Sequence, residues 1–214
     1  MDGIKTSYIE QLMERYPVLE SCRKDIEDGY RLLEQCYEQG GKLLLAGNGG
    51  SAADCAHIAG ELMKGFKLPR RIGETLRKRL GELEPSRGKE LSSQLQLALP
   101  AISLSSHEAV MTAYLNDVGG AGVFAQQILG YGRVPDVFLG ISTSGNSENI
   151  LNAALTARAL GLKVIGLTGE KGGTLAKWSD AAVKVPASET YMIQELHEPV
   201  YHCWCLMLED HFFS

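Results

Sequence analysis

The sequence predicts an α/β fold, a doubly wound and mostly parallel sheet flanked by helices. The chain has 214 residues, of which 44% are apolar, and this suits one α/β domain with a buried core. Residues 42–51 and 136–147 share one order: an apolar run, a loop of small and hydroxyl residues, and the start of a helix. Runs of strand type alternate with helical periodicity elsewhere, which favours parallel strands covered by helices on both faces.

The N-terminal part, residues 1–40, is expected to form a helical extension ahead of the sheet. Apolar residues recur at helical spacing over residues 4–15 and 19–39, with a break near Pro17 and a stop at Gly40-Gly41. A pair of amphipathic helices in this position covers a sheet face or joins subunits.

Five strands and their helices are expected after residue 41. The strands are predicted at 43–46, 97–104, 137–141, 163–167 and 181–185. The helices are predicted at 51–66, 107–115, 124–129, 148–160, 175–177 and 191–211. Pro199 removes a backbone hydrogen bond from the last helix and predicts a kink there, but the pattern leaves the direction of the kink open.

Residues 67–95 differ from the rest of the chain. They contain eight Lys or Arg and four Asp or Glu, with no long apolar stripe. Their composition is compatible with a solvated or partly disordered loop, and equally with a lid or an interface element.

Composition restricts the classes of partner. The net charge is −5, so a nucleic-acid or anionic membrane partner is not expected. No apolar run approaches the roughly 20 residues of a membrane span, and the first residues lack an apolar signal core. The five cysteines show no framework spacing and fit a reduced compartment, so a cytoplasmic location is expected.

Both repeated units end in loops suited to binding phosphate, through free amides, hydroxyls and the positive end of a helix dipole. The residues concerned are Asn48, Gly49, Gly50 and Ser51, and then Ser142, Thr143, Ser144 and Ser147. The first loop matches neither the dinucleotide nor the P-loop pattern, and a plain tight turn is its alternative. The second loop has four hydroxyls, of which Ser147 also suits a helix N-cap. Two such loops on one sheet predict a phosphorylated small-molecule ligand.

Two helices carry side chains that bind metals or move protons. His57 and Glu61 are four residues apart and share a helix face, either as a surface hydrogen bond or as part of a metal site. Gln194 and His202 lie on the last helix, roughly 80° apart around its axis. His202 has apolar neighbours, so a buried histidine with a satisfied hydrogen bond is its alternative.

Four stretches of the sequence carry a resemblance to a known family. They are GKLLLAGNGGSAADCAHIAGEL, Leu115-Asn116-Asp117, DVFLGISTSGNSENILNAALTARALGLKVIGLTGEKGG and IQELHEPVYH. With these stretches the chain resembles the sugar isomerase (SIS) domain proteins, and most closely their phosphoheptose isomerase branch. The resemblance covers residues 1–66 and about 97–211. It implies one SIS domain over residues 1–214, a three-layer sandwich of the flavodoxin or Rossmann type.

The resemblance also implies a function. Family members interconvert sedoheptulose 7-phosphate and D-glycero-D-manno-heptose 7-phosphate through an enediol, as tetramers with sites at subunit boundaries. A zinc ion would be held by residues matching His57, Glu61, Gln194 and His202. The family's phosphate contacts fall on Ser51, Ser142, Thr143, Ser144 and Ser147, and Asp117, beside Asn116, matches an acidic residue near the sugar hydroxyls. Glu61 is the expected base and His202 the expected acid.

The chain departs from the family pattern in two places. The family usually has a much shorter connector than residues 67–95, and it has an acidic residue where this chain has Tyr191. Two other functions remain open at this stage. One is an isomerase or sensor for another sugar phosphate, such as a hexosamine phosphate. The other is a noncatalytic SIS tetramer that binds the replication initiator; that branch lacks the acid and base, whereas Glu61 and His202 are both present here.

Overall fold

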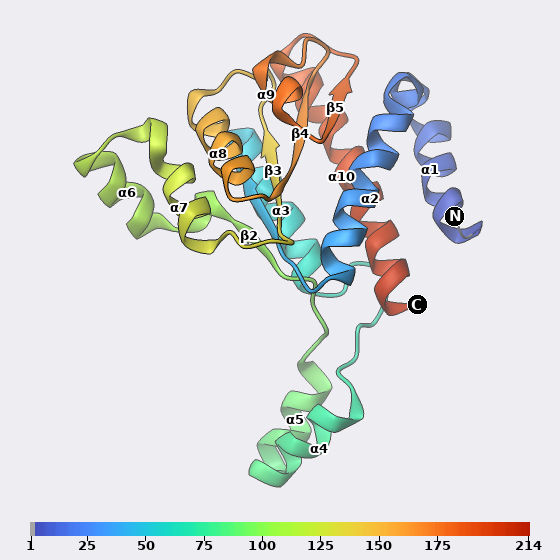
Figure 1. The fold of residues 1–214 in the computed structure, drawn as a ribbon. Coiled ribbons are helices and arrows are strands. Elements are labelled where there is room, and N and C mark those ends of the chain that lie inside the picture. Colours follow the sequence, from blue (N-terminus) through green and yellow to red (C-terminus); the bar gives the residue numbers. More distant parts are fainter. Residues whose placement is uncertain (1–2) are drawn as a thin grey trace.

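The computed structural model describes residues 3–214, and their side chains from residue 8 onward. Its centre is a five-stranded parallel sheet with the strand order β2-β1-β3-β4-β5 (Figure 1). The strands are β1 (Leu43–Ala46), β2 (Ala101–Ser103), β3 (Val137–Ile141), β4 (Lys163–Gly169) and β5 (Ala181–Val185). This arrangement confirms the predicted doubly wound α/β fold. Among the described residues, no helix is long and apolar enough to cross a membrane.

Helices cover both faces of the sheet. The α-helices of the body are α1 (Gly3–Arg15), α2 (Arg23–Glu38), α3 (Gly50–Met63), α6 (Glu108–Asp117), α7 (Val123–Tyr131), α8 (Glu148–Ala159), α9 (Gly173–Trp178) and α10 (Thr190–Phe213). Three 3₁₀ turns join them: η1 (Pro17–Cys22), η2 (Leu104–Ser106) and η3 (Gly120–Gly122). Helices α1, α2, α3 and α10 pack in one core, and α7, α8 and α9 pack in the other.

Alternation along the strands separates the two cores. Leu43 and Leu45 belong to the core with α3 and α10, whereas Leu44 and Ala46 belong to the core with α7 and α8. Successive side chains of a strand point to opposite faces, so a wholly apolar strand is needed where both faces are covered. This requirement explains why β1 and β3 are buried at every position.

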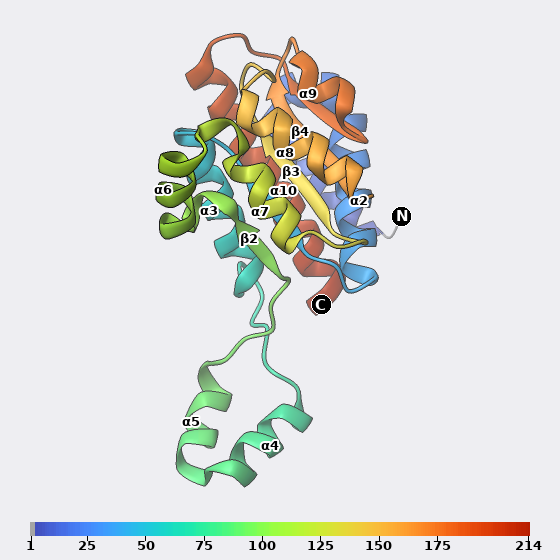
Figure 2. The same cartoon turned by 60° about the vertical axis from the view of Figure 1, so that its left-hand side comes forward.

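Residues 67–95 contain two helices, so a partly disordered loop is wrong among the alternatives left open, whereas the exposure expected of a solvated segment is found. Helices α4 (Glu74–Leu83) and α5 (Pro85–Gln94) pack against each other and project away from the body (Figures 1 and 2). We call residues 74–94 the hairpin, and residues 64–73 with 95–100 the neck. Glu84 accepts a hydrogen bond from the backbone amide of Arg87, which caps α5.

One predicted helix and one predicted strand are shorter than expected, because residues at their ends form hydrogen bonds within the neck instead. Helix α3 stops at Met63, since Lys64 is extended and the Gly65 amide donates to Gln96 Oε1 at 2.5 Å. Strand β2 begins at Ala101 instead of residue 97, because the Leu97 amide donates to the Arg70 carbonyl at 2.7 Å. Helix α10, by contrast, runs without interruption through Pro199.

Candidate functional site

The two hydroxyl-bearing loops meet at one cleft. Their strands, β1 and β3, are neighbours at the point where the strand order reverses direction, which is where ligands bind in open α/β sheets. The cleft has a volume of about 340 Å³. Its lining is Asn48, Gly49, Gly50, Ser51, Ile141, Ser142, Thr143, Ser147, Thr190 and Gln194. The structure therefore brings together nearly all of the residues predicted for the phosphate.

Hydrogen bonds fix the two loops relative to each other. The side-chain amides of Asn48 and Asn149 donate to each other's oxygens at 2.9 Å. Ser142 Oγ and Ser147 Oγ lie 2.9 Å apart. At Gly50, an added Cβ would stand 2.6 Å from Gln194 Nε2, so only glycine lets this amide approach the first turn of α3.

Three residues predicted for substrate binding lie outside this cleft. Ser144 is in the second loop, but its Oγ accepts a hydrogen bond from the Asn146 amide at 3.1 Å and shapes the turn. Asn116 and Asp117 end α6, where both are exposed and Asn116 Nδ2 donates to Asp117 Oδ1 at 2.9 Å. Within one chain, they do not contribute to the lining of the cleft.

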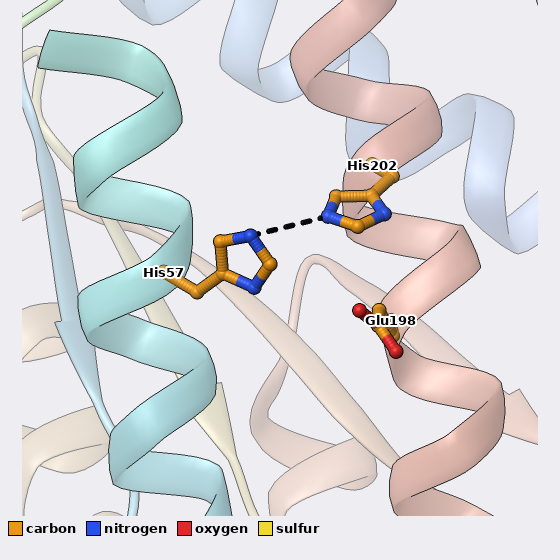
Figure 3. Close-up of side chains that lie close together, drawn as sticks. All are labelled: His57, Glu198 and His202. Carbon is orange, nitrogen blue, oxygen red and sulfur yellow. Dashed lines mark hydrogen bonds between the residues drawn. The ribbon is translucent and has the colours of Figure 1, made fainter. Parts of the chain in front are cut away.

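Helices α3 and α10 bring His57 and His202 together. Both helices begin at the edge of the sheet where the strands end, and His57 and His202 lie further along them than Ser51 and Gln194, which line the cleft. His57 Nε2 and His202 Nε2 are 3.4 Å apart (Figure 3). Burial, and then the neighbouring His57, lower the pKa of His202. Glu61 joins the pair, with Oε1 3.5 Å from His57 Nε2 and Oε2 3.0 Å from Lys64 Nζ.

A hydrogen-bonded chain orients His57. Tyr201 Oη lies 3.1 Å from His57 Nδ1 and donates to Asp54 Oδ1 at 3.3 Å. Burial raises the pKa values of Asp54 and Tyr201, so the phenol keeps its proton. Because the Tyr201 hydroxyl directs its proton to Asp54, Nδ1 of His57 is the donor to Tyr201, and Nε2 presents a lone pair to His202. Such outer partners commonly orient histidines that bind metals.

Glu198 is a further member of the cluster that sequence reasoning missed as a site residue. His57, Glu198 and His202 each offer one ligand atom, and these atoms lie within 4.8 Å of one another (Figure 3). Glu198 is four residues from both Gln194 and His202, so all three share a face of α10. That spacing could have identified Glu198 from the sequence. Tyr201 and Asp54 were harder to identify, because only the fold brings them close to His57.

The two predicted metal ligands of α10 lie apart along the helix. Gln194 lines the cleft, whereas His202 lies beside His57. His202 is eight positions after Gln194, which corresponds to about 12 Å along α10. Beside His202, a second cavity of about 320 Å³ opens between α1 and α10, and Arg15, Tyr16 and Glu198 line it. The N-terminal helices thus form part of the surroundings of the histidine pair.

Comparison with known proteins agrees with this geometry. The family model described as SIS domain matches residues 86–169. A phosphoheptose isomerase from Helicobacter pylori (strain P12) is 39% identical over 194 residues, covering 91% of this chain and 88% of the relative. The chain belongs to the phosphoheptose isomerase family.

Two further members of the phosphoheptose isomerase family match over their whole length. The protein from Pelobacter propionicus is 36% identical over 218 residues, with all of both chains covered. The solved structure of the Francisella tularensis protein superposes with a TM-score of 0.75 at 30% identity, covering 98% of this chain and 100% of that one. The family is therefore established over the full chain.

Proposed function

We propose that this chain is an aldose–ketose isomerase that converts sedoheptulose 7-phosphate to D-glycero-D-manno-heptose 7-phosphate. The observation that carries the proposal is that α3 and α10 both contribute to the lining of the cleft and also carry the His57–His202–Glu61 cluster. Ser51 lies in the first turn of α3, and His57 lies six residues further, about 9 Å along the axis. One end of an extended sugar phosphate then lies in the cleft while the other reaches the cluster. The names of the relatives support the same reaction.

Phosphate binding rests on the cleft residues. The phosphate is held by the amides at the start of α3 and by the hydroxyls of Ser51, Ser142, Thr143 and Ser147. Ser144 accepts a hydrogen bond that stabilises the turn of the second loop. Asn116 and Asp117 are assigned to the sugar hydroxyls, and we infer that they act at a site completed by a neighbouring subunit.

Proton transfer is assigned to Glu61 and His202. The Glu61 carboxylate removes a proton from C1 of the ketose, while the C2 carbonyl oxygen takes a proton from His202, which gives the enediol. Return of a proton to C2, with loss of the proton on O1, gives the aldose. Burial lowers the pKa of His202, which favours the neutral imidazole, and a neutral ring carries one N–H to donate and one lone pair to accept a proton.

A zinc ion fits the histidine pair. Two nitrogen ligands, each about 2.0–2.1 Å from a tetrahedral zinc, lie about 3.4 Å apart, which matches the separation of His57 Nε2 and His202 Nε2. Glu61 and Gln194 are the other proposed ligands, and Glu198 is a carboxylate close enough to take part. Zinc, when bound, polarises the substrate carbonyl and stabilises negative charge on its oxygen.

We also propose a homotetramer that works in the cytoplasm. Exposed apolar side chains on α6 (Val110 and Leu115), with the adjacent Val118, offer a surface for a neighbouring chain near Asn116 and Asp117. The five cysteines are all unpaired and buried, as suits a reducing compartment. Light scattering should give the mass of four 23.3 kDa chains. A monomer mass at micromolar concentration would contradict the tetramer and the shared site.

The variant Glu61→Gln tests the proposed chemistry. It keeps the size of the side chain and an oxygen for the metal, but it removes the base, so turnover of sedoheptulose 7-phosphate should fall roughly 10²–10⁴-fold while the substrate still binds. Glu195→Gln is the matched control, because Glu195 is exposed on α10. Near-normal turnover by Glu61→Gln would show that another group is the base.

A further inference from the structure

The neck joins the hairpin to the body through a buried ion pair. Arg70 Nε donates to Glu209 Oε1 at 2.8 Å, and both side chains are almost completely buried. The Glu209 carboxylate also accepts hydrogen bonds from the backbone amides of residues 66–68, at 2.7–3.0 Å. The other guanidinium nitrogens of Arg70 donate to the carbonyls of Leu62 and Glu61, at 2.6 Å and 3.0 Å. The neck is therefore tied to the last turn of the helix that carries Glu61.

A cavity of about 470 Å³ lies between the neck and the hairpin. Its lining is Pro69, Arg70, Arg71, Arg77, Lys89, Ser92, Ser93, Gln94, Leu95 and Gln96. Four of these side chains are cationic and none is acidic. The described part of the chain contains no ion-pair partner for Arg71, Arg77 or Lys89, in contrast to Arg70, which has Glu209.

We propose that this cavity binds a small phosphorylated ligand, at a site separate from the isomerase cleft. Three cations without an ion-pair partner line one concave space in a chain of net charge −5, and their like charges give that space a local positive potential that attracts an anion. Arginine binds phosphate through two parallel hydrogen bonds, and Arg71 and Arg77 come from the neck and from α4. Gln96 Oε1 is held by the Gly65 amide, which leaves its Nε2 as a further donor.

The shape and the surrounding charge favour a small ligand over a nucleic acid. A duplex needs a basic stripe along a surface, whereas these exposed cations are gathered around one concave space. The hairpin and neck carry a positive excess, but the rest of the chain is acidic and would repel a long polyanion.

Occupation of the cavity acts on the isomerase site through Arg70. Its side chain forms part of the cavity wall and also holds the carbonyls at the end of α3. A ligand that orders the neck should therefore slow opening of the last turn of α3, where Glu61 lies.

The test uses inorganic pyrophosphate as the probe, titrated calorimetrically into the full chain without substrate. The double variant Arg77→Gln with Lys89→Gln should weaken one class of site about 10-fold or more. The control, Lys78→Gln with Arg79→Gln, removes the same charge from the same hairpin outside the cavity and should change binding by less than about 3-fold. Melting temperatures check that both variants are folded.

Three results would overturn the site. The first is equal loss in both double variants, which would mean nonspecific attraction to the hairpin. The second is pyrophosphate binding by the Arg77→Gln and Lys89→Gln variant that is as tight as in the wild type, or no binding in the wild type. Tight, salt-sensitive binding of a short DNA duplex, lost equally in both variants, would assign the hairpin to nucleic acid instead. No result depends on isomerase activity, so this proposal and the proposed function can fail separately.

Hydrogen exchange tests the link to α3. Pyrophosphate should slow amide exchange at the end of α3 in the wild type and in the control, but not in the Arg77→Gln and Lys89→Gln variant. Binding with unchanged exchange in this segment would contradict the coupling through Arg70.

Discussion

The body and the hairpin are held together in different ways. In the body, strands β1 and β3 are buried at every position, and helices from both faces complete two apolar cores. In the hairpin, α4 has no buried residue and α5 buries only Gly88, while Leu83 is 84% exposed. The proposed isomerase site lies in the body, which has two apolar cores. The proposed anion site lies between the neck and the exposed hairpin. Packing therefore fixes the first site, whereas hydrogen bonds in the neck fix the second.

The largest expected effect on stability is at the junction of the two regions. Glu209→Gln leaves Arg70 buried without its counter-charge, and removal of one partner of a buried pair costs about 3–5 kcal/mol. Denaturant unfolding measures this loss. Glu82→Gln in the hairpin removes only an exposed pair with Lys78 at 3.9 Å and should change stability by less than about 0.5 kcal/mol. Equal effects of the two changes would mean that the neck is not anchored as described.

The same junction is sensitive to acid. Burial alone would raise the pKa of Glu209, but the amides of Phe66 and Lys67 and the Arg70 guanidinium lower it below its usual value. Because the folded-state pKa is lowered, the stabilisation is present above the unfolded-state pKa of about 4.5 and is lost as the pH falls through the folded-state value. The wild type should lose this contribution in acid, and Glu209→Gln should not.

The difference in burial between the body and the hairpin also explains which parts of the structure could be predicted from the sequence. The bounds of β1, β3 and β5 and both phosphate loops follow from apolar runs and small residues, because burial on two faces leaves few alternatives. The hairpin was not predicted, because its helices bury no apolar stripe that would produce a pattern. The spacing of His57 and Glu61 on one helix singled them out as candidates, and the family resemblance assigned them to the metal site. Tyr201 acts on His57 across 144 residues, a distance that no local pattern reveals.

The next effect lies in the core of the body. Burial lowers the pKa of His197 to about 4, and the backbone of Thr168 opposes this only in part. Stability linked to this group is fully present above the unfolded-state pKa of 6.5 and falls as the pH drops toward 4, by about 2 kcal/mol at pH 5. Urea unfolding at pH 7.5 and pH 5 should show this loss in the wild type and not in His197→Leu. An identical pH dependence in both proteins would contradict neutral burial of His197.

A smaller effect is expected at the phosphate cleft. Thr143→Val keeps the shape of the side chain but removes its hydroxyl, so substrate binding should weaken by about 1–3 kcal/mol without loss of stability. Thr156→Val is the control, because its hydroxyl donates to its own helix, to the Asn152 carbonyl at 2.8 Å. Unchanged substrate affinity in Thr143→Val would place the phosphate elsewhere.

The smallest effect on the body should follow removal of the hairpin. Residues 74–94 can be replaced by a short Gly-Ser connector, because Arg71 and Gln96 already pair across the neck. The free energy of unfolding should change by less than about 1 kcal/mol. The chain should stay a folded tetramer, with altered turnover or substrate choice because the neck reaches the end of α3. Failure of the shortened chain to fold would show that the hairpin supports the body after all.

The most direct test of the central claim is turnover by the intact protein with and without added zinc. Ketose phosphates of five, six and seven carbons would be supplied separately, and the aldose products identified by NMR. We predict zinc-dependent conversion of sedoheptulose 7-phosphate to the heptose 7-phosphate, with much slower reaction of the shorter sugars. Turnover of a different sugar phosphate alone would contradict the assigned substrate. No turnover of any of them would contradict the isomerase itself and favour a binding role.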